Sequence, residues 1–164
     1  MTDGGPPRAV VAPSVCLGVV SDTHGLLRPE VLAALQGSQQ IVHAGDIGDP
    51  EILERLRGIA PVTAVRGNVD HGAWALSLPG TATLEVGHLR ILIVHDADTL
   101  LLDPEREGFA GVVSGHTHRP SNKRRSGVLF FNPGSAGPGL PVSVGRLTIS
   151  GDSVNGKIFR LEVS

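Results

Sequence analysis

The chain has 164 residues, of which 40% are hydrophobic and 18% are charged, and its formal net charge at pH 7 is -2. These values are typical of a globular domain with a sizeable core, and they exclude a disordered chain and a strongly basic, polyanion-binding one. The single cysteine, Cys16, excludes an internal disulfide and fits a reducing compartment, so a cytoplasmic location is expected.

Residues 1–13 are rich in Gly and Pro, and we expect a disordered tail there, followed by a single domain over residues 14–164. The tail lacks the basic start and the continuous apolar region of a secretory signal. No window approaches the roughly 18 apolar residues of a membrane span, so no membrane partner is expected. One Trp and four Phe are few aromatic residues for stacking single-stranded bases, which argues against a nucleic-acid partner.

The first half of the chain alternates apolar runs with amphipathic segments. Runs rich in β-branched residues predict strands over residues 15–20, 40–44 and 61–66. Helices are expected between them, over residues 29–37 and 49–58, because proline suits the start of a helix and glycine its end. This alternation favours parallel strands joined by right-handed β-α-β connections.

The second half is richer in strands. Its apolar runs and glycine-centred turns predict hairpins, a short buried strand and two final strands, and three successive leucines predict a helix. These elements are expected at residues 81–87 with 89–95, 99–107 (the helix), 111–114, 123–132, 142–149 and 154–163. We therefore expect an α/β fold, a four-layer α/β/β/α sandwich of two mixed sheets with helices on the outer faces.

Oxygen and imidazole donors follow most of the predicted strands, at the point where each strand ends. If parallel strands place these ends on one rim, the donors converge. Seven donors exceed what one ion takes from a protein, and they suit two divalent ions that share a carboxylate. One such motif alone is more often a turn or a helix cap, so it is their joint occurrence that predicts a dinuclear centre. The donors are Asp22, His24, Asp46, Asn68, His95, His116 and His118.

These donors stand in ordered motifs that resemble those of the calcineurin-like metallophosphoesterases. The motifs are Asp22-Thr23-His24, Gly45-Asp46, Gly67-Asn68, His95 and Gly115-His116-Thr117-His118. The resemblance covers residues 15–163. Within the superfamily, the Gly-Asn-x-Asp form of the third motif and the later Asn-Pro-Gly-Ser segment are similar to the small prokaryotic phosphodiesterase branch, often called YfcE-like. The fold implied is the metallophosphatase sandwich.

The resemblance also implies which residue would hold which ion. The first metal would be held by Asp22, His24 and His118, the second by Asn68, His95 and His116, and both by Asp46. A hydroxide held between the ions would attack the phosphorus of a small phosphoester substrate. Mn is the metal expected, with Fe, Ni, Co or Zn as alternatives. Asn68 would also orient a bound oxygen, which makes it a catalytic candidate.

The chain departs from the pattern of larger relatives at Val69. Those relatives carry a histidine there, thought to protonate the leaving group. His71 lies two residues after Val69 and is a second catalytic candidate, with a surface loop histidine as the alternative. The missing acid favours good leaving groups, such as aryl phosphodiesters. The basic segment from Arg119 to Arg125 is either a polyanion site or a solvated hairpin.

Two classes of function are consistent with this pattern. The first is a metal-dependent phosphodiesterase that splits a phosphate ester with water. The alternative is a non-catalytic scaffold or binding protein, a role that the retromer's small metallophosphoesterase-like subunit shows for this fold. The complete donor set favours the enzyme, since scaffold relatives tend to lose ligating histidines. Exposed late strands could pair between subunits, so a homo-oligomer is a further expectation.

Overall fold

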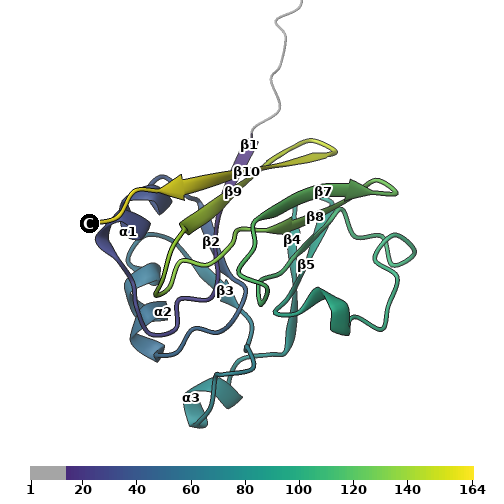
Figure 1. Ribbon diagram of the computed structural model, residues 1–164. Coiled ribbons are helices and arrows are strands. Elements are labelled where there is room, and N and C mark those ends of the chain that lie inside the picture. The colour runs from purple at the N-terminus through teal and green to yellow at the C-terminus, as the bar shows by residue number, and fades with distance from the viewer. Residues whose placement is uncertain (1–13) are drawn as a thin grey trace, which may run out of the picture.

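Two mixed five-stranded β-sheets pack face to face in the computed structural model, which describes residues 14–164 (Figure 1). The architecture confirms the predicted α/β sandwich of two mixed sheets. The tail predicted over residues 1–13 lies outside the described residues. In chain order the elements are β1 (Ser14–Val20), α1 (Pro29–Leu35), β2 (Gln40–His43), α2 (Pro50–Arg57), β3 (Val62–Ala64), α3 (Ala73–Leu76), β4 (Thr81–Val86), β5 (Leu89–Val94), η1 (Ala97–Thr99), β6 (Gly111–Val113), β7 (Ser121–Arg125), β8 (Val128–Asn132), β9 (Val142–Ser150) and β10 (Ser153–Leu161).

Each sheet contains three adjacent parallel strands and two further strands that join it through antiparallel pairing. The first sheet has the order β10-β9-β1-β2-β3, with β1, β2 and β3 parallel. The second has the order β4-β5-β6-β8-β7, with β5, β6 and β8 parallel. The loops that follow parallel strands leave from one edge of a sheet. Hydrogen bonds join these loops, as from His24 N to Asp46 O (3.0 Å) and from Gly115 N to His95 O (2.9 Å).

The main core lies between the two sheets. Side chains alternate along each strand, so Leu17 and Val19 of β1 face the second sheet, whereas Val20 packs with the helices. Side chains of β5 such as Ile91 join the same cluster from the other sheet. Because a shift by one residue would turn Leu17 and Val19 out of this core, the packing fixes the register of β1 and the point at which its loop begins.

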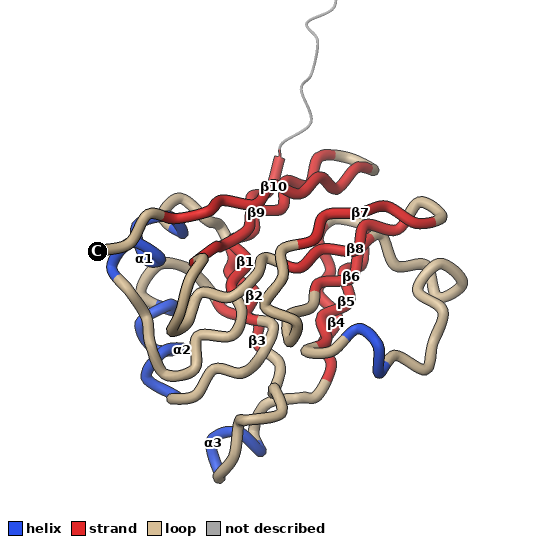
Figure 2. Tube along the Cα trace, viewed as in Figure 1, coloured by secondary structure: helices blue, strands red, loops and turns tan. Residues whose placement is uncertain are grey.

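Helices α1 and α2 cover the outer face of the first sheet (Figure 2). Both begin at a proline, and Asp49 caps α2 by accepting a hydrogen bond from Glu51 N (2.8 Å). Of the helices within residues 14–164, none is long and apolar enough to cross a bilayer. The helix side chains buried against the sheet are Val31, Leu35, Ile52, Leu53 and Leu56.

The outer face of the second sheet is covered by the long segment between β5 and β6, whose helical structure is limited to the short 3-10 helix η1 (Figure 2). The helix predicted over residues 99–107 is therefore wrong. Of its three leucines only Leu100 packs on this face, while Leu101 and Leu102 are exposed, so the run lacks the one-sided stripe of a packed helix. Pro104 then begins a turn that is closed by a hydrogen bond from Phe109 N to Pro104 O (2.9 Å).

Candidate metal centre

All seven predicted donors lie where the loops after five strands meet. The strands are β1, β2, β3, β5 and β6, three from the first sheet and two from the second. Each donor lies 2.9 to 3.8 Å from at least one other donor, measured between polar side-chain atoms. The fold therefore brings side chains that are far apart in the sequence into one small region.

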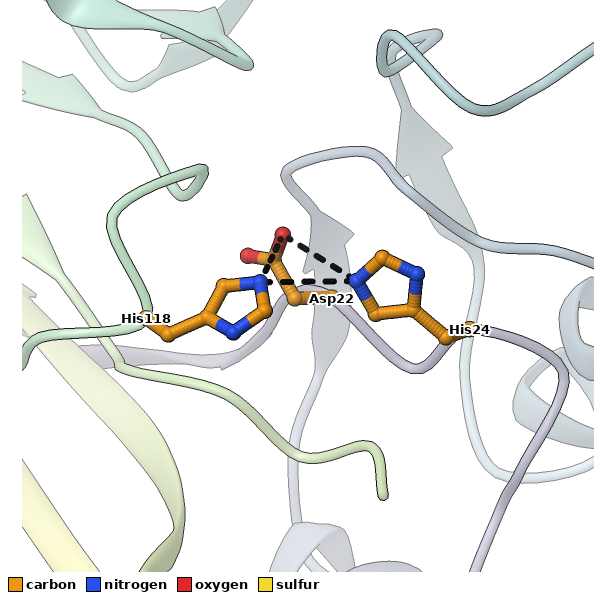
Figure 3. Close-up of side chains that lie close together, drawn as sticks. All are labelled: Asp22, His24 and His118. Atoms are coloured by element: carbon orange, nitrogen blue, oxygen red, sulfur yellow. Dashed lines mark hydrogen bonds and ion pairs between the residues drawn. The ribbon is translucent and has the colours of Figure 1, made fainter. Parts of the chain in front are cut away.

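Asp22 is the buried carboxylate of the first group of donors. Its Oδ2 accepts hydrogen bonds from Ser21 Oγ (2.5 Å) and His116 N (3.1 Å). Its Oδ1 is buried and has no hydrogen-bond partner within residues 14–164. Figure 3 shows His118 and His24 turning their Nε2 atoms toward this oxygen, at 3.2 and 3.8 Å. An unpaired buried carboxylate oxygen is costly, so the arrangement fits a cation held between the three side chains.

Asp46 lies between the first group and His95. Its Oδ2 is 3.2 Å from His95 Nε2 and 3.8 Å from His24 Nε2, while its Oδ1 accepts a hydrogen bond from Val69 N (3.0 Å). The His95 ring is fixed from behind, because its Nδ1 donates to Ala44 O (2.8 Å). That bond leaves Nε2 as the ring nitrogen available to a metal. Asp46 thus faces histidines on two sides.

Asn68 and His116 extend the group around His95. Asn68 Oδ1 is 2.9 Å from His95 Nε2 and 3.2 Å from His116 Nδ1. The His95 and His116 rings stand edge to face with centroids 5.2 Å apart. His116 Nε2 lies 3.6 Å from Asp96 Oδ2, and the other oxygen of Asp96 accepts a hydrogen bond from Asp98 N at η1. This side of the centre is therefore built from β3, β5 and β6 together.

Two sets of three side chains hold their ligand atoms within 4.8 Å of one another, and the sets have one carboxylate in common. Both combine carboxylate oxygens with imidazole nitrogens, which are donors suited to Mn²⁺, Fe, Co and Zn²⁺. The donor chemistry therefore fits divalent transition metals. The first set is Asp22, His24 and His118, and the second is Asp22, Asp46 and His95.

Charge at the centre also favours a cation. Burial disfavours the charged form of Asp46, but hydrogen bonds from His95 and Val69 N and the nearby histidine charges outweigh it, so the pKa of Asp46 is lowered. Burial likewise disfavours charged His95, yet the hydrogen bond and charge of Asp46 raise the pKa of His95 above its ordinary value. The carboxylates thus attract positive charge, which a proton or a metal ion can supply.

Five of the seven donors have a left-handed backbone, which is uncommon outside glycine. Their φ angles lie between 47° and 71°, and Ser126 is the only other non-glycine residue of 14–164 in this region. Such strain costs about 1–3 kcal/mol per residue and clusters at functional sites. A methyl group on Gly115 would overlap Ser21, so the close approach of the loops requires glycine there. The five donors are Asp22, His24, Asp46, His116 and His118.

His43 supports the loops after β1 and β2 from behind the donors. Thr23 Oγ1 donates its proton to Ile47 O (2.8 Å), so it accepts from His43 Nε2 (3.0 Å). The other ring nitrogen, Nδ1, accepts from Gly45 N (3.1 Å). A neutral ring therefore satisfies every partner, and complete burial lowers the pKa of His43 to about 3.

Acid is expected to destabilise the protein through His43. In the unfolded chain this ring is protonated below pH 6.5, whereas in the folded chain it stays neutral until the pH reaches about 3. The free energy of unfolding therefore falls across this window as the pH drops. The contribution is about 2 to 3 kcal/mol at pH 4.5. Urea unfolding in EDTA at pH 7.5 and 4.5 should show a smaller pH-dependent loss for His43→Gln than for the wild type. Equal losses would contradict this assignment.

Asp70 is a buried carboxylate that the metal-ligand pattern does not include. It accepts three backbone hydrogen bonds, from Ile47 N (3.2 Å), Gly48 N (2.9 Å) and Gly67 N (2.9 Å). These bonds tie the loop after β2 to the loop after β3. The signal for this role is its place two residues after Asn68 in the Gly-Asn-x-Asp motif.

The end of β8 and the residues that follow it support the other side of the centre. Asn132 Nδ2 donates to Gly115 O (2.9 Å) and to Thr117 Oγ1 (3.2 Å). Ser135 Oγ donates to Asp22 O (3.2 Å). The Asn-Pro-Gly-Ser segment thus packs against the loops after β1 and β6, and it holds the backbone of two donor-bearing motifs.

The second catalytic candidate, His71, stands apart from the donor cluster. Its side chain is exposed and makes no hydrogen bond or ion pair within the described part of the chain. The nearby Arg66 is occupied elsewhere, since its guanidinium donates to Leu78 O (3.1 Å) and Ala75 O (3.4 Å) near the end of α3. The loop around Asn68 therefore brings a candidate donor to the centre without joining His71 to it.

Known proteins are similar to this chain in sequence and in fold. Residues 16–152 match the calcineurin-like phosphoesterase superfamily domain, a range that contains all seven donors. A probable metallophosphoesterase of Methanocaldococcus jannaschii is 32% identical over 168 residues, which cover 93% of this chain and 85% of the relative.

Solved structures have the same arrangement of sheets. Vps29 from Chaetomium thermophilum superposes with a TM-score of 0.78 at 23% identity, covering 90% of this chain and 88% of that one. YfcE, a phosphoesterase from E. coli, gives a TM-score of 0.61 at 30% identity, covering 81% of this chain and 88% of that one. With the family match over most of its length, the chain belongs to the calcineurin-like phosphoesterase superfamily.

Proposed function

We propose that the protein is a phosphodiesterase that depends on two divalent metal ions. The observation that carries the proposal is the buried Asp22 Oδ1, which lacks a hydrogen-bond partner within residues 14–164 although two imidazole nitrogens face it. A second carboxylate, that of Asp46, lies within 3.8 Å of His24 and within 3.2 Å of His95. We assign the first ion to Asp22, His24 and His118, the second to Asn68, His95 and His116, and both to Asp46.

Two divalent ions, of which Mn²⁺ is our first candidate, would supply an activated water and positive charge for the phosphoryl oxygens. The protein would hold the donors in place before substrate arrives. Ala44 O directs His95 Nε2 to the centre, and Val69 N fixes one oxygen of Asp46. Asn68 offers a neutral oxygen, and its N–H groups would orient an oxygen of the substrate.

A preference for good leaving groups follows from the loop around Asn68. Val69 stands where larger relatives carry the histidine that serves as an acid, and the exposed His71 forms no hydrogen bond or ion pair with the donors within residues 14–164. A leaving oxygen that departs without a positioned proton donor suits esters of acidic alcohols, such as aryl phosphodiesters. We keep His71 as a candidate acid for a substrate complex in which the loop would bring its ring to the ester.

Chelation is expected to abolish hydrolysis of bis(p-nitrophenyl) phosphate, and Mn²⁺ to restore it, because the activated water and the charge of the ions are lost together. Add-back of Ni²⁺, Co²⁺, Zn²⁺ and Fe²⁺ ranks the metals, and p-nitrophenyl phosphate serves as the monoester control, with slower turnover expected. Metal analysis of the desalted protein should give about two ions per chain. If no metal restored turnover of either ester, the scaffold alternative would replace the enzyme.

A further inference from the structure

A cleft of about 630 Å³ opens beside the candidate metal centre, at the β7 edge of the second sheet. Ser114 and Thr117 line it, and both belong to the loop after β6 that carries His116 and His118. Phe130 of β8 lines it as well. The volume is typical of a site for a small molecule. One end of the cleft is therefore built by the same loop as two of the candidate ligands.

Cations outnumber acids along this cleft. Arg119, Lys123 and Arg125 line it, against one lining carboxylate, that of Asp98. The three cations are exposed, and none of them forms an ion pair with another part of residues 14–164. Arg125 lies over the ring of Phe130, 5.6 Å from its centroid. The cleft thus combines unpaired positive charge with an aromatic surface.

The alternate side chains of β7, Asn122 and Arg124, bind the first sheet, although Asn122 also lines the cleft. Asn122 Nδ2 donates to Gly156 O (2.8 Å) and Arg124 donates to Val154 O, so these two residues tie β7 to β10 of the first sheet. Because side chains alternate along a strand, Lys123 lies on the opposite face from Arg124. Arg124 therefore has a structural role, whereas the cations that line the cleft are available to bind a ligand.

We propose that this cleft binds the non-leaving group of the substrate and selects phosphodiesters in which that group carries a second anion, such as a phosphate. The proposal rests on the phosphodiesterase function proposed above. One substituent of a diester at the centre departs, and the other would run along the loop after β6 into the cleft. There Lys123 and Arg125 would meet the distal anion with charge-assisted hydrogen bonds, and Phe130 would pack against its apolar body.

Two chromogenic substrates that differ only in this distal anion provide the test. They are thymidine 5′-(p-nitrophenyl phosphate) and the same compound with a 3′-phosphate. The Mn²⁺-loaded wild type should have a kcat/KM about fivefold to tenfold higher for the 3′-phosphate, an effect expected of one or two exposed charge contacts. Lys123→Ala/Arg125→Ala should bring the two values together by raising KM for the 3′-phosphate alone. The matched control is Arg57→Ala/Lys157→Ala, which removes two exposed cations outside the cleft.

Asp98→Asn should change KM for the 3′-phosphate in the opposite direction. It removes the lining carboxylate and keeps its shape, so KM for the 3′-phosphate should fall by about twofold to threefold while the neutral diester is unchanged. Added salt should reduce the preference in the wild type, because exposed charges are screened. None of these variants replaces a residue of the candidate metal centre.

Each outcome decides between the two proposals. Equal kcat/KM for both substrates in the wild type would overturn the anion-selective cleft and leave the phosphodiesterase intact. A loss of preference in Arg57→Ala/Lys157→Ala as large as that in Lys123→Ala/Arg125→Ala would also overturn it, since net charge alone would then explain the effect. No turnover of either substrate with any metal would overturn both proposals together.

Discussion

Replacing Asp46 by asparagine is expected to lower kcat/KM for a phosphodiester by about a thousandfold, equivalent to about 4 kcal/mol of transition-state stabilisation. Asp46 Oδ2 lies 3.2 Å from His95 Nε2 and 3.8 Å from His24 Nε2, so we propose it as the ligand that both ions share. The amide keeps the shape of the side chain but removes the negative charge that holds two cations close together. Steady-state kinetics at saturating Mn²⁺ and metal analysis of the same sample measure the two consequences.

The matched control is Asp49→Asn, the same chemical change three residues along the chain. Asp49 is exposed and caps α2 through Glu51 N (2.8 Å), and asparagine caps a helix equally well. Its activity should stay within about twofold of the wild type. An Asp46→Asn variant that kept full activity and both ions would remove the bridging assignment. Equal losses in the two variants would indicate an effect of net charge instead.

The strands and the donor cluster were predictable because they depend on short-range patterns. A buried parallel strand is recognised by a continuous apolar run such as Val15 to Val20. A polar motif at the end of that strand must lie at the rim of the sheet. Donors from five such runs therefore had to converge once the sheets formed. The prolines that start α1 and α2 mark those helices in the same local way.

Other features depend on contacts that no local pattern encodes. Three successive leucines fit a helix as well as a loop, and only the packing of Leu100 alone on the second sheet decides between them. The role of His43 depends on Thr23, which comes from another strand's loop. In the sequence Asp70 resembles an ordinary turn residue, because its acceptor role depends on Ile47 N and Gly67 N, which donate hydrogen bonds to its carboxylate. Residues that hold the loops are thus harder to predict than the candidate metal ligands.

Removing the Asp70 carboxylate is expected to be the most destabilising single change among the residues that support the centre. Asp70→Ala leaves three backbone N–H groups, those of Ile47, Gly48 and Gly67, without their acceptor. An unsatisfied buried donor costs about 1–3 kcal/mol, so the free energy of unfolding should fall by about 3 to 5 kcal/mol. Urea unfolding in EDTA measures this loss without any contribution from bound metal.

Two further variants separate the buried bonds from a general effect of charge. Asp103→Ala removes an exposed carboxylate that accepts one backbone bond, from Glu105 N (3.1 Å), and should cost less than about 1 kcal/mol. Asp70→Asn keeps one acceptor oxygen and should fall between the two alanine variants. Because Asp70 ties the loop of Asp46 to that of Asn68, its loss should also reduce turnover, since small displacements of positioned groups cost about a hundredfold. A stable Asp70→Ala protein with full activity would show that the loops hold their geometry without this carboxylate.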